Sequence, residues 1–156
     1  MTRRRIVSVG LALLAVVCAA SIIRASSRPG ISAAADLSGA RLVGADLHGR
    51  DMRDAVLVEA DLSSANLSGA NLSGSRMEGA PEHPTLLVGA RLAGANLARV
   101  AARSARLSGS DLHRATLCGA SLCDADLEQA NLTGALLRGA RFDRTTWWPA
   151  AFRSRR

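Results

Sequence analysis

The sequence predicts an all-β solenoid in which one short repeat forms nearly the whole domain. Five-residue units run from residue 35 to residue 144 without losing phase, which gives 22 units. Only two Phe, two Trp and no Tyr are present, so Ala, Leu and Gly must fill a closely packed interior. A period of five fits neither the 3.6-residue period of a helix nor the two-residue period of a strand, and it is typical of a solenoid.

The first element is an N-terminal hydrophobic helix over residues 1–28, predicted as a membrane anchor or signal segment. Three Arg residues precede an uncharged run over residues 6–23, and Arg24 and Arg28 follow it. As a helix this run would be about 27 Å long, close to the ~30 Å hydrocarbon core of a bilayer. An uncleaved anchor, a cleaved signal and a buried helix all remain open. Val17 stands before Cys18 where lipoprotein processing prefers a small residue, which disfavours a lipidated cysteine.

The distribution of Arg around this run bears on location. Three Arg residues and the amino terminus precede the apolar run, and two Arg residues follow it. This small excess of positive charge favours an N-terminus inside the cell and a body outside it. We therefore expect a membrane-anchored protein with an extracytoplasmic body, or a secreted one if the signal is cleaved. Residues 29–34 form the linker to the body.

The repeat has a consistent inward pattern. Leu occupies the central position of 17 units, Ala stands two residues earlier in 17, and Gly closes 12. A Gly at the end of a unit suits a tight turn, because it adopts positive φ without steric penalty.

The tandem units, for example residues 60–64 (ADLSS) and 65–69 (ANLSG), resemble those of pentapeptide-repeat proteins. The resemblance covers residues 35–144 and implies a right-handed quadrilateral β-helix with four units per coil, hence about five and a half coils. The central Leu and the Ala two before it would point inward. At ~4.8 Å per coil the rod would be about 26 Å long. Residues 20 apart would stack, which predicts one exposed outward ladder of Asp51, Asn71, Arg91, Asp111 and Asn131.

Residues 80–84 (APEHP) break the pattern. Glu82 occupies an inward position between two prolines, and a buried carboxylate is costly while Pro cannot donate to a ladder. We expect these residues to bulge outward, with Ala102, one coil later on the same wall, accommodating the distortion. The loop is either a tolerated irregularity or an interaction loop in which Glu82 and His83 contact a partner.

Residues 145–156 are predicted to form an aromatic cap and a basic tail. Trp147, Trp148 and Phe152 follow the last regular unit, and Trp147 falls on the phase of the inward Leu. This cluster predicts a hydrophobic cap over an exposed sheet edge, or a patch for self-association as a homodimer.

Charge and composition exclude several functions. All 20 basic residues are Arg, which removes lysine Schiff-base chemistry and the phosphate-loop lysine. The net charge of +7 comes from the two ends, because residues 35–144 hold 12 Arg and 13 acidic residues. A nearly neutral body lacks the basic face that nucleic-acid binding requires.

The candidate metal ligands and nucleophiles are scattered. On a coil of four units His48, His83 and His113 lie on three different walls, and Cys118 and Cys123 lie on adjacent walls as free thiols. A Leu-filled interior leaves no substrate cavity, and no hydrolase, zinc-protease or phosphate-loop motif is present. We expect no enzyme activity, no metal and no cofactor.

These observations predict a non-catalytic β-helical scaffold or protein-interaction module, membrane-anchored or exported, with an unspecified protein partner. The resemblance implies an alternative, because some pentapeptide-repeat proteins resemble a DNA duplex in shape and charge, bind DNA gyrase and protect it from quinolones. Those members are strongly acidic, whereas residues 35–144 carry a net charge of only −1.

Overall fold

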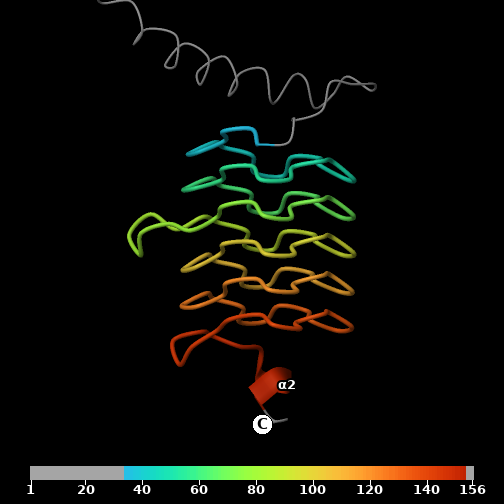
Figure 1. The fold of residues 1–156 in the computed structure, drawn as a ribbon, viewed down its shortest axis with the longest axis vertical. Helices are drawn as coiled ribbons and strands as arrows, with labels where there is room; N and C mark the ends of the chain where they lie inside the picture. The colour runs from blue at the N-terminus through green and yellow to red at the C-terminus, as the bar shows by residue number, and fades with distance from the viewer. Residues whose placement is uncertain (1–33, 154–156) are drawn as a thin grey trace, which may run out of the picture.

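The computed structural model describes residues 34–153, which form a rod of stacked coils (Figure 1). Within this range the regular elements are isolated β-bridges and one short helix at the C-terminal end, α2 (Ala150–Arg153). The predicted hydrophobic helix over residues 1–28 lies outside the described residues. Among residues 34–153, no helix is long and apolar enough to cross a membrane.

The bridges form four parallel ladders, which make four walls. Each wall consists of one ladder and the residue two positions after each ladder member, and we name it after its first member. The Asp36 ladder joins Asp36, Val56, Arg76, Ala101, Ser121 and Arg141; the Arg41 ladder joins Arg41, Asp61, Leu86, Arg106, Asp126 and Trp147; the Asp46 ladder joins Asp46, Asn66, Arg91, Asp111 and Asn131; the Asp51 ladder joins Asp51, Asn71, Asn96, Thr116 and Leu136.

Each regular unit turns a corner with the same geometry. The carbonyl of Leu67 accepts a hydrogen bond from the N–H of Ala70 at 3.0 Å, and Gly69 between them has φ +65°. A positive φ at the third turn residue is the signature of a type II turn, which favours Gly there. Several corners carry other residues at positive φ, Gln129 among them at +60°.

The interior is filled as the repeat predicts. Behind the Arg41 wall, the inward side chains of Leu62, Leu87 and Leu107 stack on one another with 0 %, 0 % and 3 % exposure. The neighbouring Ala positions, such as Ala60 and Ala105, are buried too, so the two inward positions of the unit are confirmed in the interior of the rod. Thr85 takes an Ala position, and its buried hydroxyl donates to the carbonyl of Leu57 at 2.8 Å.

Residues 80–84 leave the coil, and this changes the register. Above the loop each bridge spans one coil of four units, as in Asp51 with Asn71, but the next step joins Asn71 to Asn96 and so spans one unit more. The predicted bulge is therefore confirmed. The predicted stacking across it is wrong, because the bulged unit occupies no place in the ladder: Ala102 follows Met77 instead of lying beneath Glu82.

The same shift corrects two other predictions. The predicted outward ladder is divided between walls: Asp51 and Asn71 belong to one, while Arg91, Asp111 and Asn131 belong to another. His48 and His113 share the Asp46 wall, three coils apart, and only His83 lies elsewhere, in the loop. At ~4.8 Å per coil the two wall histidines are about 14 Å apart, too far to share a metal ion.

Candidate interaction surface

The loop of residues 80–84 is a closed turn that projects beside the Asp36 and Arg41 walls (Figure 1). Ala80 and His83 pair in an antiparallel bridge, and the N–H of His83 donates to the carbonyl of Ala80 at 2.9 Å. Gly79 allows this approach, because a Cβ there would collide with the His83 carbonyl. Glu82 and His83 are both exposed. The loop therefore presents a carboxylate and an imidazole to solvent in a defined turn.

The C-terminal residues close the lower end of the coil stack. Trp148 is 6 % exposed, and its ring meets Phe142 edge-on at 5.2 Å and stacks on Phe152 at 4.7 Å. Trp147 instead pairs its backbone with Asp126 and leaves its side chain 57 % exposed.

Trp147 falls on the phase of the inward Leu in the sequence, but it does not take the inward position in the structure. A regular coil would bridge Asp126 to Thr146, but the bridge is to Trp147, so the last coil holds one residue more than a regular coil. The extra residue moves Trp148 onto the inward position. Thr146 lies on the preceding Ala position, where its hydroxyl donates to the carbonyl of Leu122 at 2.9 Å.

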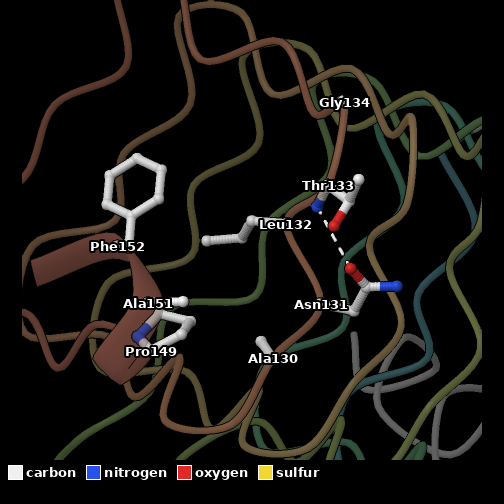
Figure 2. Close-up of a pocket in the computed structure, with 8 residues that line it drawn as sticks. All are labelled: Ala130, Asn131, Leu132, Thr133, Gly134, Pro149, Ala151 and Phe152. Carbon is white, nitrogen blue, oxygen red and sulfur yellow. Dashed lines mark hydrogen bonds between the residues drawn. The ribbon is translucent and has the colours of Figure 1, made fainter. Parts of the chain in front are cut away.

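A hollow of about 350 Å³ lies between the last coil and α2. Figure 2 shows the side chain of Leu132 pointing toward the space in front of Phe152 and Ala151, with Pro149 at its border. On the opposite side, the N–H of Thr133 donates to Oδ1 of Asn131 at 3.1 Å (Figure 2). The hollow is thus an apolar seam of the cap and brings no titratable side chains together.

The outward positions carry local polar networks. Oδ1 of Asp46 accepts from the Asn66 amide at 3.1 Å, and the same rung recurs between Asp111 and Asn131 at 3.0 Å. Such exposed contacts support the register of the ladder and add little stability.

Ion pairing is sparse. Within residues 34–153 the ion pairs are Arg53 with Asp51 at 2.7 Å and Arg76 with Glu78 at 3.0 Å, all on exposed side chains. The hydrogen bond from Arg53 is the main cause that lowers the pKa of Asp51.

Asp143 is the most strongly perturbed carboxyl group of the described chain. The Thr145 hydroxyl donates to it at 2.6 Å, and the backbone N–H of Asp124 donates at 3.1 Å. With the hydroxyl bond as the largest cause, these donors lower its pKa to about 2. The carboxylate therefore ties the C-terminal turn to the coil above it.

The remaining candidates for chemistry stay apart. Cys118 and Cys123 are free thiols, both half-buried. Among residues 34–153, no group of three or more His, Cys, Asp or Glu side chains could hold a metal ion.

The sequence did not predict that apolar side chains of the Arg41 wall form a surface. Their signal was the run Leu86-Leu87-Val88 directly after the loop, in a unit without the usual polar residue before the inward Leu.

The sequence model of the pentapeptide-repeat family matches residues 40–79, 85–124 and 110–146, with eight copies. The break in this match coincides with the loop of residues 80–84. No match was found among curated proteins.

Solved structures of pentapeptide-repeat proteins are similar to this chain. One from Nostoc PCC 7120 is 34 % identical, covers 86 % of this chain and 84 % of its own, and has a TM-score of 0.43. Rfr23 from the cyanobacterium Cyanothece 51142 is 31 % identical over 74 % of this chain, which spans 62 % of that protein, with a TM-score of 0.38. QnrB1, a plasmid-mediated fluoroquinolone resistance protein, is 14 % identical over 74 % of this chain and 93 % of its own, with a TM-score of 0.36.

Pentapeptide-repeat proteins fold as right-handed β-helices and are generally non-catalytic structural or interaction modules. The repeat model matches more than half of the chain, along most of residues 40–146, so the chain belongs to the pentapeptide-repeat family.

Proposed function

We propose that this protein is a non-catalytic scaffold, membrane-anchored or exported through residues 1–28, that presents its walls and its loop to a protein partner. The observation that carries the proposal is the loop of residues 80–84. The ladder continues past it with each wall intact, so the rod holds an exposed Glu82 and His83 on a rigid support. Binding residues are often found on loops held by such supports.

Site-specific photo-cross-linking in the cells that produce the protein tests the scaffold function. A photoreactive residue replaces, one at a time, one position in the loop and one on each wall: His83, Arg103, Val88, His113 and Arg138. We expect a discrete adduct with another protein from at least one position. The absence of adducts from all five positions would overturn the proposal.

Location is tested by thiol labelling of intact cells with a membrane-impermeant reagent, in a Cys18→Ser background. We expect Cys118 and Cys123 to be labelled in intact cells, in the membrane fraction for an anchored protein and in the medium for a secreted one. Because both thiols are half-buried, labelling after denaturation is the control. Labelling only after lysis would overturn the extracytoplasmic location.

The charge of the body disfavours the gyrase alternative, which requires a strongly acidic protein. Residues 35–84 hold four Arg and eight acidic residues, whereas residues 85–144 hold eight Arg and five. The rod is thus acidic toward one end and basic toward the other, unlike the uniform negative charge of a DNA duplex. Quinolone protection of gyrase by low-micromolar protein in a supercoiling assay would instead support gyrase binding.

A further inference from the structure

Large apolar side chains are concentrated on one of the four walls. Val43, Val88 and Trp147 on the Arg41 wall are 56 %, 40 % and 57 % exposed. They are three of the five large hydrophobic residues exposed in residues 34–153. Leu86 lies half-buried beside Val88. Most other outward positions of this repeat carry small or polar residues. The fold therefore does not require the large apolar side chains of the Arg41 wall.

The register shift places this apolar centre next to the loop. Residues 80–84 leave the coil at the corner before Thr85, and Leu86 then pairs beside Asp61. Pro81 of the loop lines a hollow of about 370 Å³ with Trp147 and with side chains from lower coils. Loop and wall therefore form one continuous surface.

The hollow is acidic. Asp124, Asp126 and Glu128 line it, and Arg106 is its one basic side chain. None of these residues belongs to an ion pair of the described chain. Asp126 accepts a hydrogen bond from the N–H of Glu128 at 2.9 Å, and Asp124 accepts one from the Ser104 hydroxyl at 3.0 Å. Three carboxylates, one guanidinium and the exposed ring of Trp147 suit a guest cation.

The backbone of the wall restricts the form of the guest. Its N–H and C=O groups are paired along the axis, as between Leu62 and Leu86 at 2.8 Å and between Leu86 and Ala60 at 2.9 Å. They are not free to pair with an added strand, which favours a guest that satisfies its own backbone hydrogen bonds, as a helix does. From Leu86 to Asp126 is two ladder steps, or about 10 Å. Two helical turns cover about 11 Å.

Resting on the scaffold function proposed above, we propose that the Arg41 wall docks an amphipathic helix of a partner protein. Apolar side chains of that helix lie over Leu86 and Val88. An Arg or Lys about two turns further along the same face enters the acidic hollow beside Trp147.

A peptide pair tests this chemistry on the full chain. The probe is an 18-residue Ala-based helix with two Leu four residues apart and one Arg seven residues after the second. The control peptide carries Glu in place of Arg. We expect the Arg peptide to quench the fluorescence of Trp147 and to bind at least tenfold more tightly, with weaker binding at higher salt. Equal binding of the two peptides, or no binding of either, would overturn the proposal.

Variants locate the binding site. Val88→Ser and Glu128→Gln are each expected to weaken the Arg peptide about tenfold. Leu136→Ser, which removes a still more exposed apolar side chain (56 % against 40 % for Val88) from the Asp51 wall, is expected to change affinity less than twofold. Equal loss with Leu136→Ser would overturn the proposal, because binding would then be non-specific. A wall already covered by a second copy or by residues 1–33, seen as protection of a Val88→Cys thiol from labelling, would overturn it as well.

The cross-linking positions separate this inference from the scaffold function. An adduct from Val88 that disappears with Glu128→Arg supports both. Adducts from His83 or from other walls, with none from Val88, overturn the docking wall and leave the scaffold function standing.

Discussion

The register around the loop makes a strong prediction about two neighbouring units. Glu82 and Leu87 both stand at the central position of a five-residue unit, so the repeat alone treats them alike. In the structure Leu87 is 0 % exposed between Leu62 and Leu107, whereas Glu82 is exposed in the loop. Leu87→Ala should therefore be costly and Glu82→Ala should not.

The magnitudes follow from these surroundings. Truncating a fully buried Leu to Ala costs about 2–5 kcal/mol, and the stacked Leu neighbours on both sides limit collapse of the cavity. We expect about 3 kcal/mol for Leu87→Ala, which corresponds to roughly 10 °C in Tm for a domain of this size. Glu82→Ala is an exposed substitution and should remain within about 0.5 kcal/mol of the original protein. Deleting residues 80–84 should also be tolerated, because it leaves every rung of the four wall ladders in place.

Urea and thermal unfolding of the three variants, followed by circular dichroism, provide the measurement. Fluorescence is recorded in parallel, because a solenoid can unfold in parts and the two probes would then diverge. Equal destabilisation by Glu82→Ala and Leu87→Ala would refute the register. Unfolding of the protein by the five-residue deletion would do the same.

Three further predictions concern the corners, the core and the cap. A Cβ at Gly109 meets no described atom within 4 Å, so Gly109→Ala should lower the free energy of unfolding in urea by about 1 kcal/mol, through its positive φ alone. Gln129→Gly, at a corner that also has positive φ, should raise the free energy of unfolding by up to that amount. Among the residues that the structure describes, the buried hydroxyl of Ser110 has no hydrogen-bond partner. Ser110→Ala should therefore raise the free energy of unfolding by about 1 kcal/mol in the same assay, and a decrease would show that the hydroxyl is satisfied. The pKa of Asp143 lies at about 2 in the folded state against 3.8 for the free group, so its contribution is present above pH 3.8 and is lost as pH falls toward 2. Asp143→Asn should reduce the pH dependence of stability in that window, and an unchanged pH profile would contradict the bond from Thr145.

Much of the fold could be predicted from local pattern. The phase of five, the inward Leu and Ala and the turn residues all act within one unit, and each unit adopts the same geometry wherever the pattern is complete. The outward bulge of residues 80–84 could also be predicted, because Pro81, Glu82 and Pro84 each oppose a place in the ladder. The site was harder to predict, because Leu86 and Val88 form a surface only with residues of other coils.

By itself the sequence determined the repeat, the composition of the interior, the family resemblance and the place where the pattern breaks. Only the tertiary structure decided which residues stack on one another. A unit that leaves the coil moves every later residue to another wall, and nothing local records whether a defective unit stays in the ladder or leaves it. The same holds at the C-terminal end, where one extra residue turned Trp148 inward and Trp147 outward. Each choice depends on which arrangement keeps apolar layers filled and backbone groups paired across coils, a balance between segments that lie a whole coil apart in the sequence.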